Sequence, residues 1–179
     1  MLRGVESMSP AEVQELFAFN AWASRRIFDG AAQLAAADYL RDLKSSHGGI
    51  HGTLSHIVWA EQLWLHRWLG KPAPAVPQGK DLASLAHVRA RWDEVEAERG
   101  SFLRDLTESK LRDTIAIKPT TGGEYRHSFG DMLRHVVGHS SYHRGQVITL
   151  MRQLGVKPPS TGLILFCRER TTGRPIANF

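Results

Sequence analysis

Hydrophobic residues recur at helical spacing along four long stretches of the chain, at about residues 9–34, 45–69, 81–108 and 129–155. Ser9 and Pro10 suit the N-cap and the first position of the first helix. Ser45 and Ser46 are expected to open the second helix, and Gly70 follows its last apolar residue. The pattern therefore predicts four amphipathic helices in a single domain over residues 1–179.

The connections between these stretches differ in character. Residues 71–80 are rich in proline and predict a loop. Thr114 to Ile117 suggest a short strand, Thr121-Gly122-Gly123 a turn, and Glu124 to His127 a return strand. The short apolar run within residues 157–170 fits either a last helix or a strand. The predicted fold class is all-α, a four-helix bundle with a long crossover connection that contains a small β-hairpin before helix four.

The last long helix carries histidines at intervals of four residues, His135, His139 and His143. Residues four apart share one face of a helix. His139 and His143 fall inside the apolar stripe, and His135 lies at its edge. The large apolar residues of this stripe are Phe129, Met132, Leu133, Val136, Val147, Leu150, Met151 and Leu154.

The second helix adds a third inward-facing histidine. It is apolar around most of its circumference, and His56 projects from within the apolar arc. Its polar wedge holds His51, Ser55, Gln62 and His66. Buried imidazoles need polar partners, which can be a backbone carbonyl, a water or a metal ion. If His56, His139 and His143 bind one ion, they leave a coordination position open, as in catalytic sites. Imidazole suits Zn, Ni, Fe or Cu, so the ligand type alone does not identify the metal.

Composition narrows the class of protein. Hydrophobic residues make up 42% and charged residues 23% of the chain, which is ordinary for a globular domain. The formal charge of +5 is scattered, so neither a nucleic-acid partner nor a membrane partner is expected. A single cysteine, Cys167, excludes an internal disulfide and fits a reducing compartment. With no signal-like or membrane-spanning apolar run, we expect a cytoplasmic protein.

The polar residues near the histidines identify no catalytic group. Val136 follows His135 and Ser140 follows His139, where the HExxH motif would have glutamate. The motif and its general base are therefore absent. The candidate helpers are Glu61, Arg67, Tyr142, Arg144 and Gln146. For Arg144 and Gln146 we expect bonds to helix ends or to a neighbouring helix instead of catalysis. His47, His87 and His127 are expected at the surface, and Trp59 and Trp64 can line a pocket.

Three segments together resemble the DinB-like, YfiT-like family of damage-inducible four-helix metalloproteins, which is unrelated to the DNA polymerase of the same name. They are ELFAFNAWASRRIFD, TLSHIVWAEQLWLHRWLG and HVVGHSSYHRGQV, and TGLILFCRE near the end adds to the likeness. The resemblance covers most of the chain in the family's order. One departure is Gly138, where many relatives are expected to have asparagine; it lies off the core face.

The resemblance implies a bundle, often a homodimer, with a divalent ion (Zn, Ni, Fe or Mn) held by His56, His139 and His143. His135 is the alternative to His143 as a ligand, or else a neighbour of the site. Related proteins suggest a metal-dependent enzyme acting on a small-molecule substrate, either a transferase that uses a low-molecular-weight thiol or a hydrolase. The alternative is a non-catalytic stress-response protein with a structural metal, and DNA binding is a third, weaker hypothesis.

Overall fold

The computed structural model describes residues 8–77, 82–117 and 122–173. The long helices are α1 (Pro10–Ala31), α3 (Ile50–Leu69), α4 (Leu85–Arg104) and α6 (Phe129–Gln153). Three shorter helices accompany them, α2 (Ala36–Leu40), α5 (Glu108–Arg112) and α7 (Leu163–Thr172). Strands β1 (Thr114–Ile117) and β2 (Tyr125–Ser128) pair as an antiparallel hairpin in which Thr114 lies opposite Ser128. The predicted fold class is confirmed: a mostly helical bundle with one small hairpin.

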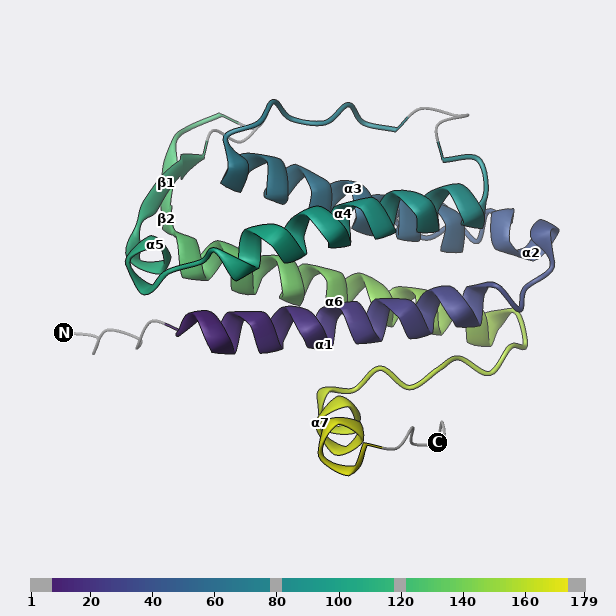
Figure 1. Ribbon diagram of the computed structural model, residues 1–179. Helices are drawn as coiled ribbons and strands as arrows, with labels where there is room; N and C mark the ends of the chain where they lie inside the picture. The colour runs from purple at the N-terminus through teal and green to yellow at the C-terminus, as the bar shows by residue number, and fades with distance from the viewer. Residues whose placement is uncertain (1–7, 78–81, 118–121, 174–179) are drawn as a thin grey trace.

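The four long helices lie side by side along one axis (Figure 1). Each of α1 and α3 packs against both α4 and α6, so α4 and α6 stand diagonally across the bundle. The helices α3 and α4 run in the same direction, and residues 70–77 of their connection return along the bundle (Figure 1). The connection with α5 and the hairpin crosses one end of the bundle, from α4 to the start of α6 (Figure 1).

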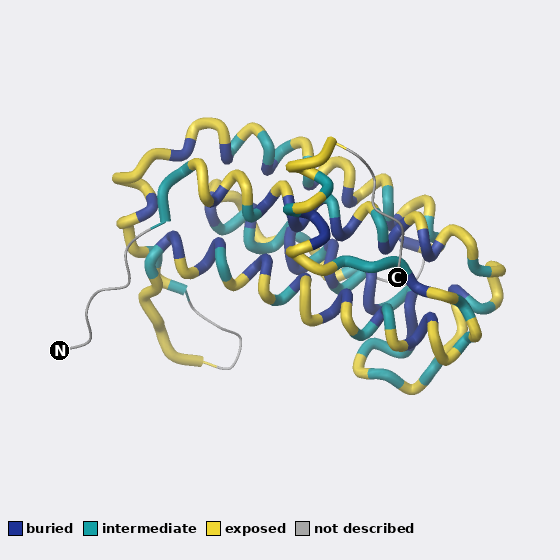
Figure 2. The backbone as a smooth tube through the Cα atoms, turned by 90° about the horizontal axis from the view of Figure 1, so that it is seen from below, coloured by how far each residue is buried: buried dark blue, intermediate teal, exposed yellow. Residues whose placement is uncertain are grey.

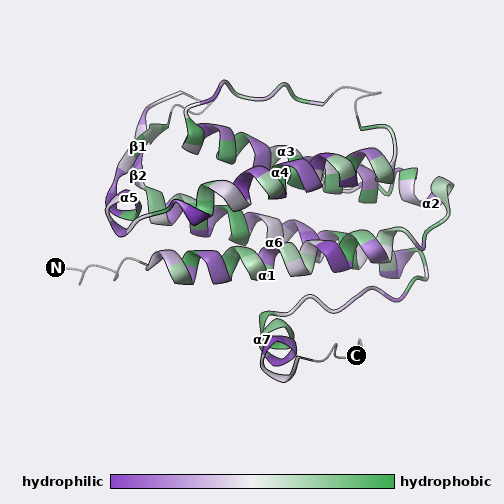
Figure 3. Ribbon diagram, viewed as in Figure 1, coloured by the Kyte–Doolittle hydropathy of each residue, from purple (hydrophilic) through white to green (hydrophobic). Residues whose placement is uncertain are grey.

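Local sequence signals explain where the helices begin. Ser9 caps α1, its side chain accepting from the backbone N–H of Glu12 while Glu12 bonds back to Ser9. Ser128 caps α6 by accepting from the backbone N–H of Asp131. Hydrophobic and hydrophilic residues alternate along each long helix (Figure 3), and the buried ones face the other helices (Figure 2). These contacts are what the amphipathic pattern predicts.

The second long helix begins later than predicted. It starts at Ile50, and the residues before it form a tight loop in which Ser45 and Gly48 pair as a β-bridge. Lys44 and Gly48 have positive φ angles of 56° and 79°, which are incompatible with a helix. The predicted start at Ser45 was therefore wrong, and His47 lies in a loop instead of on a helix.

The other element predictions differ in smaller ways. The third predicted stretch, residues 81–108, corresponds to α4, which is shorter at both ends and has Ser84 as its N-cap; α5 begins only at Glu108. The C-terminal apolar run is the helix α7, which packs Phe166 against Phe19 and Trp22 of α1. Thr121 of the predicted turn, Asp81 at the predicted start of the third helix, residues 78–80 of the predicted loop and residues 174–179 lie outside the described residues. No helix in the described ranges is both long and apolar enough to cross a membrane.

The hydrophobic core consists of two clusters along the bundle axis. One joins the first half of α1 to the end of α3, with Val13, Leu65 and Phe129 among its members. The other joins the end of α1 to the start of α3, with Ile27 and Ile50 among its members. Each long helix contributes buried polar residues near the boundary of the two clusters, apart from Thr53, which bonds the Gly49 carbonyl at the start of α3, and His143. Those near the boundary are Asn20, Ser24, Glu61, Arg99, Ser140 and Arg144.

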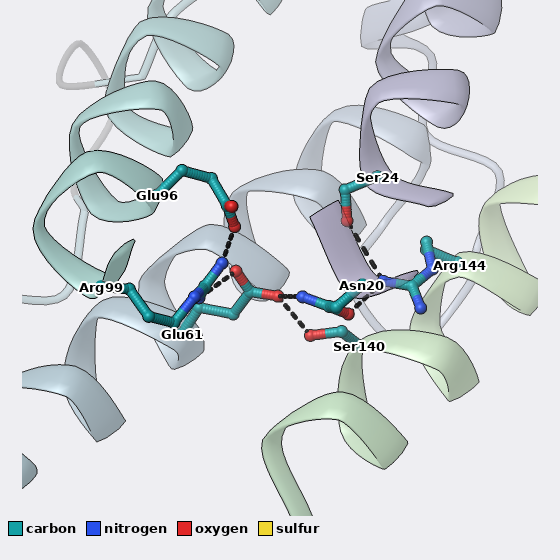
Figure 4. A network of polar contacts seen from close by, with 7 residues as sticks. All are labelled: Asn20, Ser24, Glu61, Glu96, Arg99, Ser140 and Arg144. Atoms are coloured by element: carbon teal, nitrogen blue, oxygen red, sulfur yellow. Dashed lines mark hydrogen bonds and ion pairs between the residues drawn. The ribbon is translucent and has the colours of Figure 1, made fainter. Parts of the chain in front are cut away.

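This polar layer is one connected network centred on Glu61 (Figure 4). Arg99 of α4 donates to Glu61 Oε2 at 2.8 Å, and Asn20 of α1 donates to Oε1 at 2.8 Å. Ser140 of α6 donates to Oε1 at 2.6 Å. Arg144 extends the network by donating to Asn20 Oδ1 at 2.6 Å. Burial works to raise the pKa of Glu61, but the Arg99 charge and these hydrogen bonds outweigh it and hold the pKa below its ordinary value.

We expect Glu61→Ala to lower the free energy of unfolding by about 3–5 kcal/mol, because it leaves the buried Arg99 guanidinium with only Glu96, which is 20% exposed, as a carboxylate partner, and leaves the buried Asn20 and Ser140 donors without their acceptor. Urea unfolding followed by circular dichroism measures this loss. The control is Glu94→Ala, which removes a carboxylate that is 70% exposed and paired with Arg91, and should cost less than about 1 kcal/mol. Equal small losses for both variants would contradict a central role for the network.

Candidate metal centre

Three of the histidines predicted to face inward meet between α3 and α6. His56 Nε2 lies 3.1 Å from His139 Nε2, across the interface between the two helices. The His143 ring lies 4.6 Å from that of His56 and 4.4 Å from that of His139, measured between centroids. His143 is buried, and His56 and His139 are partly buried. The predicted set of His56, His139 and His143 is therefore brought together.

A fourth histidine, His47, joins them, and its predicted surface position was wrong. Its ring stacks on His56 with centroids 4.0 Å apart and planes 16° apart. The loop can lie so close to α3 because Gly52 has no side chain; a Cβ there would overlap the carbonyl oxygen of His47. Helical periodicity missed His47 because it does not lie on a helix. The signal that could have found it is the Gly48-Gly49 pair after the histidine, which favours a turn.

The arrangement fits a metal ion. Nitrogens of His47, His56 and His143 all lie within 4.8 Å of one another, so this group could hold one. Two nitrogens bound to one tetrahedral zinc ion at about 2.0–2.1 Å lie roughly 3.3 Å apart. The separation of 3.1 Å between His56 and His139 is close to that value. His139 is not part of that group, so the three histidines whose nitrogens lie closest to metal-binding geometry differ from the predicted set by His47 in place of His139.

The surroundings keep the imidazoles in the form that binds metals. Burial, followed by the neighbouring histidines, lowers the pKa of His56 to about 4. Burial is also the main cause that lowers the pKa of His139 to about 4. Both rings are therefore neutral at neutral pH, as metal ligands must be. Gln146 Oε1 lies 2.8 Å from His143 Nδ1, an arrangement that fits a proton on Nδ1 and leaves Nε2 free to coordinate.

Two pockets flank the histidine cluster. One has a volume of about 360 Å³. It is lined by His47, His56 and Trp59, and by residues of the connection between α3 and α4 that include Leu82. The other, of about 370 Å³, lies on the far side of His135 and is lined by Trp64 and Arg67 among others. The prediction that Trp59 and Trp64 line a pocket is confirmed. His135 is exposed, and its ring lies 5.9 Å from that of His139, at the edge of the cluster.

The other candidate helpers have structural partners or lie apart. Glu61 and Arg144 belong to the buried network, which confirms the structural role expected of Arg144. Gln146 bonds His143 of its own helix instead of a neighbouring helix, so its predicted partner was wrong. Tyr142 is 67% exposed, with its ring 5.1 Å from that of His143. The structure supports no single catalytic residue among them.

Four long helices around a cluster of inward-facing histidines define a class, helical-bundle proteins with a candidate metal centre between two helices. The model of the DinB family matches residues 8–173. The chain belongs to the DinB family.

Individual relatives agree with this assignment. The chain is similar to Protein DinB of Bacillus subtilis, with 28% identity over 163 residues that cover 85% of this chain and 92% of that protein. It is also similar to the uncharacterized protein YizA of the same organism, with 24% identity over 152 residues, covering 85% of this chain and 94% of YizA. The crystal structure of a DinB-like protein from Bacillus cereus shares the fold, with a TM-score of 0.64, 17% identity, and coverage of 86% of this chain and 98% of that chain.

We expect the metal-free protein to lose stability as the pH falls from about 6.5 to about 4. Histidine in the unfolded chain has a pKa of about 6.5. The pKa of His56 and of His139 is about 4 in the folded protein, so the unfolded chain binds more protons in this window. Replacing both with asparagine should flatten the dependence of the unfolding midpoint on pH, measured by denaturant titration. The exposed His87→Asn variant is the control, and an unchanged slope in the double variant would contradict the burial of the two rings.

Proposed function

We propose that this protein is a metal-dependent enzyme that binds one divalent ion at His56, His139 and His143. The observation that carries the proposal is the convergence of neutral imidazoles from α3 and α6 at a position bordered by pockets. A set of three histidines leaves room for a water or a substrate atom. A bound divalent ion would supply Lewis acidity, lowering the pKa of a thiol or a water and polarising a carbonyl.

The chain's own residues set the conditions for this chemistry. Gln146 fixes the orientation and tautomer of His143 through its contact with Nδ1. Ser140 and Arg144, each the residue after a histidine of α6, are anchored in the buried network and hold that helix at a fixed rotation. The adjoining pockets offer space for a small molecule. Transfer to a low-molecular-weight thiol and hydrolysis are the two reactions that we propose to test.

A structural metal site is the second candidate, and the position of His47 favours it. With four imidazoles in contact, all four coordination positions of a zinc ion can be filled by protein, which is typical of closed structural sites. The two candidates differ in what His47 does. In the enzyme His47 lies beside the ion or exchanges with substrate; in the structural site it is the fourth ligand. The homodimer, the native metal and the cytoplasmic location stay predictions.

We expect the protein, purified without an affinity tag, to contain about one divalent ion per chain by elemental mass spectrometry. His56→Ala, His139→Ala and His143→Ala should each lose most of it, because each removes one of the three proposed ligands and two ligands hold a divalent ion weakly. His87→Ala, at an exposed position of α4, is the matched control and should keep the ion. If the wild type takes up no ion after reconstitution with Zn, Ni, Fe or Mn, these histidines only bond one another and the proposal fails.

His47→Ala separates the two candidates. For the enzyme we expect the variant to keep its ion, and chelation of the wild type to lower the melting temperature only slightly. For a structural site, loss of a ligand should remove the ion, and chelation should lower the melting temperature markedly, because metal binding is then part of the folding free energy. Calorimetry with and without chelator, alongside metal analysis, distinguishes the outcomes. His66→Ala is the control, since His66 bonds the Pro72 carbonyl at the end of α3.

A further inference from the structure

A second, largely apolar pocket lies beside the histidine cluster, between α3, the hairpin and the first half of α6. We call it the Arg67 pocket. Its volume of about 370 Å³ falls within the range typical of small-ligand sites. Its lining residues are Trp64, Arg67, Ile117, Tyr125, His127, Asp131, Met132 and His135. Most of this wall is aromatic or aliphatic, so its polar groups decide what the pocket can bind.

Arg67 is a positively charged residue of this wall that forms no ion pair with another described residue. Its guanidinium lies over the Trp64 ring at 4.7 Å, and burial lowers its pKa. Within the described part of the chain, no carboxylate pairs with it. Asp131, the acidic residue of the wall, instead accepts from Arg134 at 3.2 Å and from Ser128 at 2.7 Å. A half-buried arginine keeps its charge. An anion entering the pocket would therefore meet guanidinium N–H donors that are not already paired with a carboxylate.

The pocket adjoins the candidate metal centre. The His135 ring lies 5.1 Å from the Trp64 ring on one side and 5.9 Å from the His139 ring on the other. His139 in turn lies 3.1 Å from His56, between their Nε2 atoms. The His135 side chain therefore lies between a molecule that fills the Arg67 pocket and the histidine cluster.

We infer that the Arg67 pocket binds a small organic acid, its carboxylate on the Arg67 guanidinium and its apolar body against Trp64, Ile117 and Met132. The planar fork of arginine matches a carboxylate with two parallel hydrogen bonds. The apolar wall accounts for the body of the ligand, because it gains from leaving water. As the class of substrate, this acid rests on the proposed function; its binding in the pocket needs no metal.

The test is isothermal titration calorimetry with phenylbutyric acid and with its amide, which has the same body and no charge. Both are titrated into chelator-treated protein and into zinc-reconstituted protein. We expect the acid to bind both forms, about tenfold or more tightly than the amide, because a hydrogen bond to a charged group is lost with the amide. Arg67→Met should weaken acid binding by a similar factor and leave amide binding unchanged.

Matched variants keep the result interpretable. Arg67→Lys retains the charge and should keep part of the preference for the acid. Arg152→Met removes an exposed arginine near the other end of α6 and should change nothing. Tyr125→Ser removes a ring that is 56% exposed and lines the pocket, and should weaken acid and amide alike. Should Arg67→Met fail to fold by circular dichroism, the comparison of acid with amide and the Arg67→Lys variant decide the question.

Three results would overturn the inference. The first is equal binding of acid and amide. The second is acid binding that needs zinc and is lost in His56→Ala but not in Arg67→Met, which would place the carboxylate on the metal. The third is an Arg67→Met variant that binds the acid normally but changes its mass in solution, which would assign the pocket to a second copy of the chain. Acid binding by a protein that takes up no metal would refute the proposed function and leave this inference standing.

Discussion

The carboxylate of Glu61 is fully buried, and the rest of the bundle is arranged to satisfy it. An isolated charge in a protein interior is unstable, so it needs opposite charge and hydrogen-bond donors in a fixed geometry. Arg99 supplies the charge from α4, and Asn20 and Ser140 supply donors from α1 and α6. One side chain of α3 thus fixes the position of the other three long helices. Apolar contacts alone would tolerate small rotations and shifts between helices, whereas these hydrogen bonds do not.

The positions of the clustered histidines depend on this network. Glu61 follows His56 by five residues on α3, and Ser140 and Arg144 directly follow His139 and His143 on α6. When the network sets the rotation of α3 against α6, it also sets the distance between the imidazoles on the two helices. The polar layer lies at the boundary of the two apolar clusters, which explains why a buried polar network is accommodated without interrupting either of them. Fold and candidate site therefore depend on the same contacts.

Helical periodicity predicted the four long helices and the inward position of His56, His139 and His143, because each of these follows from residues on one regular element. It could not predict His47. That residue reaches the cluster through a turn with positive φ angles and through close packing on Gly52, and neither follows a repeating pattern. The buried network was predicted only in part. The bond expected between Arg144 and a neighbouring helix is confirmed, but Glu61 was a candidate catalytic helper, and only the packing of four helices shows that it meets Arg99 and Ser140. The Arg67 pocket likewise depends on the hairpin lying against α3 and α6.

The central claim is that this ordered cluster holds a divalent ion with one position left open. The absorption spectrum of the protein loaded with Co²⁺, recorded before and after addition of a small thiol, tests it most directly. The account predicts visible bands typical of a four-coordinate ion with nitrogen ligands, and a new sulfur-to-cobalt band when the thiol is added. Both should be absent in His56→Ala. A spectrum of free aqueous cobalt would contradict metal binding, and a nitrogen-ligated spectrum that does not respond to thiol would contradict the open position.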